Sequence, residues 1–269
     1  MTISILGCGW YGKALATALI ADGHRVKGSA TSAEKLAALA DAGIEPFVVD
    51  FKADQETYTP EFFACDVLII SIPPRTRHGE GSDYLRKIQR IIDAVTHYGG
   101  KNVIYISSTA VYGESCTEVT EADIPKPDTA SGEILLQAEN LFNAQQTLKT
   151  TIIRFGGLVG HGRHPGRFFA GKKNVPNGRA PVNLVHLTDC IGISKVVIRQ
   201  NKFGLIINGV APHHPQKMNF YRRAAAQAGL EIPQFMDELN AWKIVDSTVL
   251  LQELNYQFSV ANWDDCNFI

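Results

Sequence analysis

The sequence predicts an α/β protein built around a doubly wound parallel sheet. Short apolar runs alternate with amphipathic helical patterns through residue 107, an order typical of parallel sheets with helices on both faces. The run at 66–72, "DVLIISI", is continuously apolar, as expected for a strand buried on both faces. A glycine-rich turn comes after the first run, at residues 7–12. Right-handed crossovers would bring the carboxyl ends of these strands to one edge of the sheet, where ligands bind.

The expected elements are set by apolar periodicity along the chain. The expected strands are residues 3–6, 24–30, 46–50, 66–72, 102–107, 150–155 and 204–209. The expected helices are residues 11–23, 32–43, 84–100, 131–147, 187–200 and 220–230. Residues 113–130 read as a polar loop, and 156–183 are rich in Gly, Pro and Arg without clear periodicity. A loop as long as the second is usually functional.

Composition and charge restrict the class of partner. The chain has 269 residues, of which 45% are hydrophobic and 20% charged, a balance typical of a globular protein. Its 26 Lys and Arg nearly cancel 27 Asp and Glu, so neither nucleic acid nor an anionic membrane is expected as the main partner. The longest apolar run is far below the ~20 residues of a membrane span.

The N-terminus and the cysteines favour a cytoplasmic protein. Met1 leads directly into the first expected strand, so we expect no export signal. The five cysteines are scattered and form no Cys-x-x-Cys pair. A reduced compartment with buried or incidental thiols is the simplest interpretation.

The segment "ILGCGWYG" predicts a dinucleotide site. Gly7, Gly9 and Gly12 form a G-x-G-x-x-G pattern between the first strand and the first helix. In such a turn the first glycine permits the bend, the second admits the pyrophosphate and the third lets helix and strand pack closely. The anion would lie at the positive helix N-terminus, where Trp10 and Tyr11 belong to the first turn.

The end of the second strand bears on the choice between NAD and NADP. An acid there would hold the ribose hydroxyls of NAD, but Thr31 and Ser32 stand at this place, with Lys27 and Lys35 nearby. Hydroxyls and lysines suit a 2′-phosphate, which favours NADP over NAD. Alternatively, Thr31 or Ser32 only caps the next helix.

Further cofactor contacts are expected where other strands end. Asp50 ends the third strand, where it either reaches the adenine amino group or caps the segment after it. Ser71, Ile72 and Pro73 end the fourth strand at the same edge. Arg75 and Arg77 come directly after them and could meet a phosphate of cofactor or substrate.

The order of motifs resembles a known family. "ILGCGWYG", "VVDF", "ISSTAVYG", "TTIIRFGGLVG" and "VNLVHLTD" together are similar to the extended short-chain dehydrogenase/reductases, the NAD-dependent epimerase/dehydratase family. "GGLVGHGRHPGRFFAGK" and "VNLVHLTDCIG" resemble its atypical YeeZ-like branch. The resemblance implies a Rossmann-type domain and a smaller, interleaved C-terminal substrate-binding part. We expect the first over 1–155, with 184–209 returning to it, and the second from 156–183 and 210–269.

The resemblance also shows a departure at the catalytic residues. By position Ser108 matches the family's catalytic hydroxyl, and Ser107 and Thr109 flank it at the ligand edge, where we expect contacts with cofactor and substrate respectively. Aligning the acid that comes after the family's Tyr-x-x-x-Lys pair on Glu139 places Ser131 at the Tyr position and Leu135 at the Lys position.

Loss of this pair alters the expected chemistry. A serine hydroxyl does not ionise usefully near neutral pH without an adjacent base. Leu135 carries no charge, so Ser108 and Ser131 remain as the candidate catalytic residues. Tyr112 in "AVYG" is more simply explained by packing than by acid catalysis.

The expected substrate is small. Gly157 and Val182 stand where related sugar-nucleotide epimerases often carry a substrate-binding Asn and an Arg, which argues against a nucleotide sugar. Arg163 and Arg167, in a glycine-rich loop, suit a phosphate or carboxylate, although a solvated loop explains them equally well. The histidines have no spacing typical of a metal site.

These observations predict an NAD(P)-binding protein of epimerase/dehydratase or reductase type with altered catalytic residues. Its substrate would be small, and anionic or sugar-derived. The alternative is an NAD(P)-binding sensor or scaffold without turnover, which the loss of Tyr and Lys would favour. A monomer or a homodimer is expected.

Overall fold

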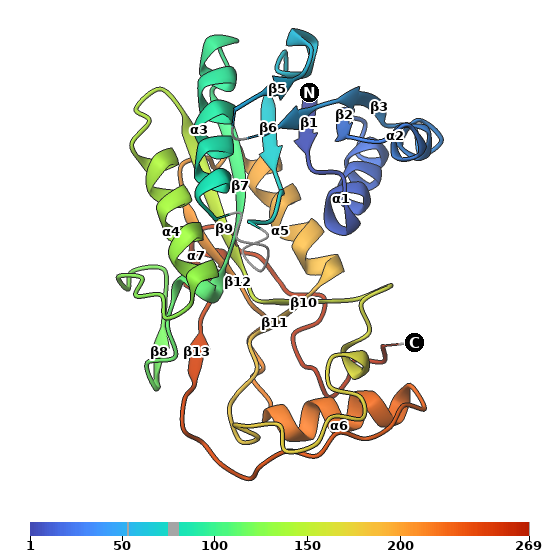
Figure 1. The fold of residues 1–269 in the computed structure, drawn as a ribbon, viewed down its shortest axis with the longest axis vertical. Coiled ribbons are helices and arrows are strands. Elements are labelled where there is room, and N and C mark those ends of the chain that lie inside the picture. The colour runs from blue at the N-terminus through green and yellow to red at the C-terminus, as the bar shows by residue number, and fades with distance from the viewer. Residues whose placement is uncertain (53, 75–80, 269) are drawn as a thin grey trace.

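The predicted doubly wound sheet is present. The computed structural model describes residues 1–52, 54–74 and 81–268. Within them, seven parallel strands form one sheet in the order β12-β9-β7-β6-β1-β2-β3 (Figure 1). Their bounds are Thr2–Leu6 for β1, Arg25–Ala30 for β2, Glu45–Val48 for β3, Val67–Ile70 for β6, Asn102–Ser108 for β7, Lys149–Phe155 for β9 and Ile206–Gly209 for β12. Each corresponds to a strand expected from an apolar run.

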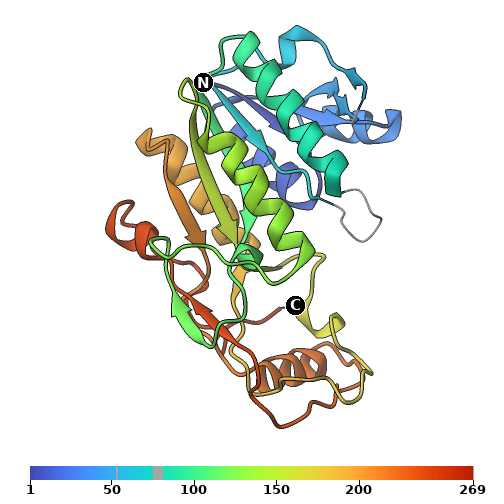
Figure 2. The ribbon, with the colours of Figure 1, turned by 60° about the vertical axis from the view of Figure 1, so that its left-hand side comes forward.

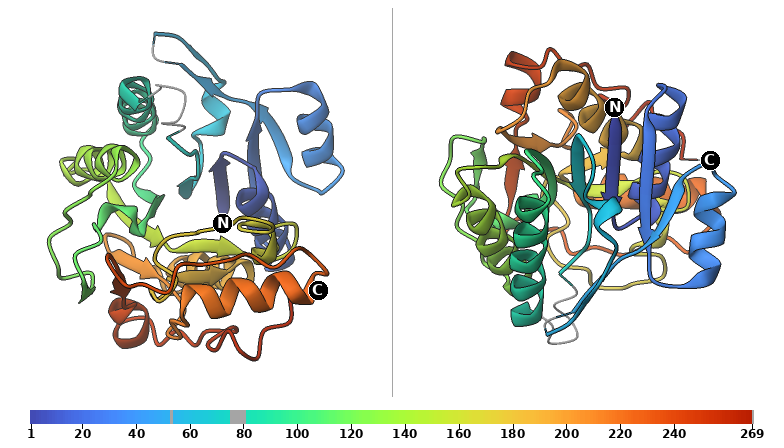
Figure 3. Two further views of the ribbon diagram at one scale, coloured as in Figure 1. Left: turned by 60° about the horizontal axis from the view of Figure 1, so that its bottom comes forward. Right: turned by 90° about the horizontal axis from the view of Figure 1, so that it is seen from above.

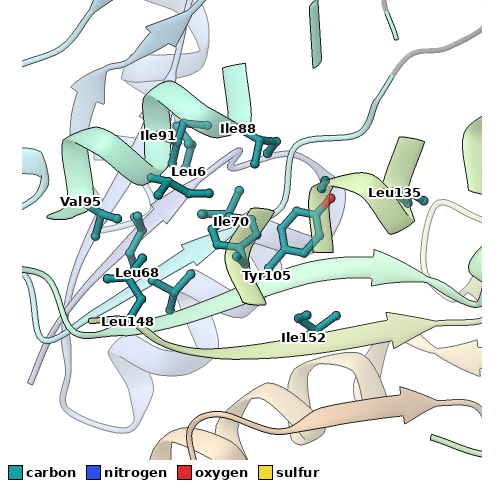
Figure 4. Packing of buried hydrophobic residues seen from close by; sticks show 14 of the residues in the cluster. Leu6, Leu68, Ile70, Ile88, Ile91, Val95, Tyr105, Leu135, Leu148 and Ile152 are labelled. Carbon is teal, nitrogen blue, oxygen red and sulfur yellow. The ribbon is translucent and has the colours of Figure 1, made fainter. Parts of the chain in front are cut away.

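Helices cover both faces of the sheet, as expected for parallel strands. The helices are α1 (Trp10–Ala21), α2 (Ala33–Ala40), α3 (Gly81–His97), α4 (Ala130–Asn143), α5 (Leu187–Gln200), α6 (Lys217–Gln227) and α7 (Thr248–Gln252). Helices α3 and α4 pack on one face, and α1, α2 and α5 on the other. Viewed from above, the sheet separates these two layers (Figure 3). Figure 4 shows Leu68 and Ile70 of β6, with Tyr105 of β7, packed against α3.

The sheet order reverses beside β1, and this positions a ligand crevice. Strand β2 pairs with one side of β1 and β6 with the other, both in parallel. Connections from the two sides therefore leave in opposite directions at the carboxyl ends. Open parallel sheets bind their ligands at such a switch point. Here the chain leaves β1 at Leu6 and β6 at Ile70.

Smaller elements lie beyond the carboxyl edge of the sheet (Figure 2). Strand β10 (Gly157–Val159) pairs with β11 (Leu184–His186), and β8 (Thr117–Val119) pairs with β13 (Lys243–Val245). Helix α6 packs on a short 3₁₀ helix at Pro165–Arg167. The last described residues lie beside α6 (Figure 1), where Trp263 and Phe268 contact Phe220.

The short strands β8 and β10 fall in segments where we expected a loop or no regular structure. The polar segment 113–130 contains β8, and the aperiodic segment 156–183 begins with β10. These three-residue strands are too short to show a periodicity. Their partners are distant in sequence, so only the tertiary fold brings them together.

The end of the chain returns to the main sheet. Helix α7 packs on β12, and Leu250 and Leu254 belong to the core beneath α1 and α5. Part of 210–269, the segment expected to bind substrate, therefore packs on the main sheet.

Asp189, in the first turn of α5, holds this returning segment. Its side chain is fully buried. Its Oδ1 accepts hydrogen bonds from Ser259 N at 2.7 Å and Tyr256 Oη at 2.9 Å, and its Oδ2 accepts from Val260 N at 3.1 Å. A carboxylate that satisfies two backbone N–H groups fixes the path of the chain around it.

We predict that Asp189→Ala lowers the free energy of unfolding by about 2–4 kcal/mol, because it leaves buried donors without an acceptor. Urea denaturation monitored by circular dichroism measures this. Asp22→Ala is the control. It removes a largely solvent-exposed ion pair between Asp22 and Lys195 of α5, and this loss should lower the free energy of unfolding by less than about 1 kcal/mol. Equal losses in the two variants would show that Asp189 does not anchor the segment.

Candidate functional site

The glycine turn after β1 is held in one conformation by neighbouring strands. Gly7 has φ +99°, which favours glycine. Its N–H donates to Ser29 Oγ at 2.8 Å, and its carbonyl oxygen accepts from Ser71 Oγ at 2.7 Å. A Cβ at Gly12 would lie 2.4 Å from Gly7 O, so helix and turn can approach this closely only with glycine. The turn is therefore rigid before any ligand arrives.

Gly9 faces open space at the start of α1. A Cβ built on Gly9 meets no described atom within 4 Å, and no side chain caps the helix there. First-turn N–H groups of a helix have no partner within the helix, so they can bind an anion here. A cavity of about 500 Å³ adjoins the turn. Its lining includes Gly7, Gly9, Thr31, Lys35, Asp50, Ser71, Ile72, Pro73, Tyr84 and Lys87. The turn and cavity fit a bound dinucleotide.

The far end of this cavity carries the residues considered for NADP. Thr31 and Lys35 line it, whereas Ser32 precedes α2 and is absent from the described lining. Lys27 was expected nearby but is buried elsewhere: its Nζ donates to the carbonyl oxygens of Glu61 and Ala64, the second at 2.7 Å. Lys27 lies in the middle of β2, paired with Ser4 of β1, and so lies away from the carboxyl end of the strand, where the cavity is.

Other expected cofactor residues have varied environments. Asp50 lines the cavity and forms an ion pair of 3.7 Å with Lys52. Trp10 and Tyr11 turn their side chains toward protein, because Trp10 Nε1 donates to His161 O at 2.6 Å and Tyr11 Oη lies 2.6 Å from Ser194 Oγ. Neither residue is among the described residues that line the 500 Å³ cavity. Arg75 and Arg77 lie outside the described residues.

A second cavity, of about 440 Å³, lies at the end of β7. Ser108 and Thr109 line it, together with residues of the smaller elements beyond the sheet. Ser108 Oγ accepts a hydrogen bond from Ala110 N at 3.2 Å, so its O–H can still donate. Strand β7 neighbours β6, whose exit at Ser71–Pro73 lines the first cavity. The two cavities thus adjoin neighbouring strand ends.

Sequence reasoning missed two lysines of this second cavity. Lys217 begins α6 and Lys243 lies on β13, and both line the cavity with Ser108. Lys243 precedes only two apolar residues, Ile244 and Val245, and so belongs to no recognisable motif. Only the pairing of β13 with β8 brings Lys243 to this place.

Ser107 lies beside Ser108 but faces the interior. Its Oγ donates to Glu139 Oε1 at 2.6 Å, and Glu139 pairs with Arg154 at 2.6 Å. Arg154 Nη1 in turn donates to Tyr112 Oη at 2.7 Å. Burial raises the pKa of Tyr112 despite the nearby guanidinium. Ser107 and Tyr112 are therefore committed to a buried polar network, and neither is among the residues that line the two cavities.

Helix α4 supplies neither a tyrosine nor a lysine to the site. Ser131 is half-buried in its first turn and is absent from the described lining of both cavities. Leu135 is 5% exposed and belongs to the core that α4 forms with α3 and the sheet (Figure 4). A cation at position 135 would be buried among apolar groups.

The two arginines considered for substrate lie apart from the second cavity. The guanidinium of Arg163 stacks on the Trp10 ring at 4.4 Å. Arg167 is exposed at the end of the 3₁₀ helix that packs on α6. Neither is among the described residues that line the 440 Å³ cavity. Arg163 instead connects the loop at 160–163 to the first turn of α1.

The Cys8 thiol, within the glycine turn, is protonated near neutral pH, because burial raises its pKa to about 12.

Over the described ranges, His, Cys, Asp and Glu form no group of three suited to a metal. No helix in the same ranges is long and apolar enough to span a membrane.

Comparison with known proteins agrees with the glycine turn and its cavity. A family model described as NAD(P)H-binding matches residues 7–185. The chain belongs to this NAD(P)H-binding family. Protein YeeZ of Escherichia coli (strain K12) is 37% identical over 262 residues, covering 95% of each chain.

Two solved structures have the same fold as this chain. UDP-glucuronic acid 4-epimerase from Bacillus cereus, in complex with NAD, has a TM-score of 0.80 at 18% identity and covers 98% of this chain and 94% of its own. Human epimerase family protein SDR39U1, with NADPH, has a TM-score of 0.73 at 18% identity and covers 98% and 96%. The chain is thus an NAD(P)-binding protein with the fold of epimerases and short-chain dehydrogenase/reductases.

We predict that Gly9→Val abolishes NAD(P) binding while the fold is retained, because its side chain would enter ligand space and meet no protein atom. Calorimetric titration with NADPH and NADH measures binding, and thermal unfolding measures the fold.

Gly12→Val is the comparison variant. Its Cβ would collide with Gly7 O, so it should lower Tm as well as binding. If Gly9→Val bound NADPH or NADH with wild-type affinity, the pyrophosphate could not lie at the glycine turn.

Proposed function

We propose that the protein is an NAD(P)-dependent enzyme of epimerase/dehydratase or reductase type, with altered catalytic residues and a small anionic or sugar-derived substrate. The observation that supports this most is the position of Ser108. It lines the second cavity at the end of β7, next to the strand whose exit lines the cofactor cavity. A substrate in the second cavity would therefore lie beside the cofactor.

The chain's own groups have distinct roles in this proposal. The glycine turn and the start of α1 bind the pyrophosphate. Ser108 accepts a hydrogen bond from Ala110 N and donates its O–H to the substrate oxygen. When bound, NAD(P) supplies or accepts the hydride. Water or another group in the cavity gives the proton when the substrate is reduced and takes it when the substrate is oxidised, because α4 carries Ser131 and Leu135 in place of Tyr and Lys.

We further propose a preference for NADP over NAD. The end of β2 offers Thr31 and Lys35 to the cavity, and no acid stands at residues 29–32. A carboxylate there would repel a 2′-phosphate, and an ammonium attracts it. Relatives of the fold bind either cofactor, NAD in the Bacillus cereus epimerase and NADPH in human SDR39U1.

Lys35→Ala tests this preference. We expect the affinity for NADPH to fall about tenfold, the usual effect of losing a charge-assisted hydrogen bond. The affinity for NADH should stay unchanged, since NADH lacks the phosphate. Calorimetric titration of both cofactors measures the difference. Tighter binding of NADH by the wild-type protein would refute the preference and leave the dinucleotide site intact.

A non-catalytic NAD(P) sensor is the second candidate. The environment of Leu135 favours it, because a core position at 5% exposure has no room for a charged catalytic group. Turnover decides between the two candidates.

Ser108→Ala tests the enzymatic proposal. Cofactor oxidation or reduction is monitored by absorbance over a panel of hydroxy acids, aldehydes and polyols. We expect Ser108→Ala to lower kcat about 10²–10³-fold, as loss of a hydrogen bond to the reacting oxygen does, with unchanged cofactor affinity.

Ser131→Ala is the matched control, since it makes the same change outside the cavity lining. It should change kcat less than about threefold. A loss of kcat equal to that of Ser108→Ala would show that Ser131 takes part in catalysis. Absence of turnover on the whole panel, with NAD(P) bound, would favour the sensor.

A further inference from the structure

We propose that the second cavity binds a small oxygenated ligand through a carboxylate or phosphate, which the ammonium groups of Lys217 and Lys243 hold. This inference rests on the proposed function in taking the cavity as the substrate site. It differs from the sequence-based expectation, which assigned the anion to Arg163 and Arg167. Those arginines are absent from the described lining of this cavity.

Lys243 presents a largely buried charge to the cavity. The residue is 7% exposed. Its Nζ donates to the carbonyl oxygen of Tyr112 and lies 3.1 Å from Glu114 Oε1. An ammonium has three N–H donors, and these contacts use two of them. Glu114 is 43% exposed, so water screens its charge and it compensates Lys243 only partly. A ligand anion would complete the compensation.

Two asparagines fix the backbone that carries Lys243. Asn183 Nδ2 donates to Lys243 O at 2.9 Å, and Asn183 Oδ1 accepts from Val245 N at 2.8 Å. Asn177 Nδ2 donates to Ala241 O at 2.7 Å, and its Oδ1 accepts from Asn240 N at 2.7 Å. The segment that leads into β13 is therefore attached to the cavity wall at both ends. Such preorganisation lowers the entropy cost of binding a ligand.

Lys217 supplies the second charge from α6. Its Nζ donates to Pro176 O at 3.1 Å and lies 5.4 Å from the centre of the Phe169 ring. Partial burial lowers its pKa, which means that the protonated form has lost solvation. An anion in the cavity would restore that stabilisation.

The remaining lining gives the cavity a polarity suited to such a ligand. Glu114 is the sole carboxylate among the described lining residues, against two lysines. Phe169 and Tyr221 form an aromatic wall, and Ser108 and Thr109 offer hydroxyls at the sheet edge. The ligand would place its anion at the lysines and an oxygen at the hydroxyls. A neutral ligand would leave the two ammonium groups with only the partial compensation that Glu114 provides.

A matched set of three probes tests the inference. Glycerol 3-phosphate, glycerate and glycerol share a carbon skeleton and differ in charge. Each is titrated calorimetrically at low salt into protein saturated with NADPH, so that the phosphate cannot occupy the cofactor cavity. At least one anionic probe should bind about tenfold more tightly than glycerol or better, the scale of one charge-assisted hydrogen bond. The two anionic arms distinguish a phosphate from a carboxylate.

Lys217→Met and Lys243→Met should each weaken the anionic probe about tenfold, with NADPH affinity unchanged. Lys172→Met is the control. Lys172 Nζ lies 5.3 Å from the same Phe169 ring, but Lys172 is exposed and absent from the described lining. The Lys172→Met variant should therefore bind the probe with the same affinity as the wild type. If Lys243→Met does not fold, comparing the probe affinity of Lys217→Met with that of Lys172→Met still tests the inference.

Equal affinity for all three probes, or equal losses in Lys217→Met and Lys172→Met, would overturn the inference while NAD(P) binding stands. Failure of NADPH to bind at all would instead refute the proposed function. The same titrations without NADPH would then still compare Lys217 with Lys172, so the two failures are distinguishable.

Discussion

A buried ion pair between Glu139 of α4 and Arg154 of β9 holds the ligand edge of the sheet in place. The two side chains are 1% and 3% exposed and lie 2.6 Å apart. Removing two charges from water costs several kcal/mol, and the cost is offset only when the remaining donors and acceptors are satisfied. Ser107 Oγ and Tyr112 Oη provide such partners. The pair therefore fixes a helix, two strands and the turn after β7 relative to one another.

Tyr112 extends this constraint to the part of the chain beyond the sheet. Its hydroxyl lies 3.1 Å from Asn208 Oδ1 at the end of β12, and its carbonyl oxygen accepts from Lys243 on β13. Tyr112, for which the sequence favoured a packing role over acid catalysis, thus joins the buried network to the second cavity. The hydroxyl of Ser108, one residue from Ser107, is directed by the same network because its neighbour's side chain is held inside.

The molecule combines a glycine turn suited to a dinucleotide with a helix α4 that carries neither Tyr nor Lys. Gly7, Gly9 and Gly12 have the geometry that a dinucleotide requires. Leu135 packs in the core, so α4 supports the fold at this position. Charge at the second cavity comes from β13 and α6, elements that lie outside the sheet. The second cavity therefore combines hydroxyls from the end of β7 with ammonium groups from the C-terminal half.

The sequence by itself determined the doubly wound sheet, its seven strands and the dinucleotide turn, because these depend on local periodicity and on glycines at fixed spacing. It did not determine that Lys27 is buried away from the cofactor, that Ser107 binds Glu139, or that Lys217 and Lys243 share a cavity with Ser108. Those outcomes depend on where along a strand and on which face a side chain lies, and on pairings such as β8 with β13. Contacts between residues so distant in the chain leave no local pattern, so only the tertiary structure could decide them.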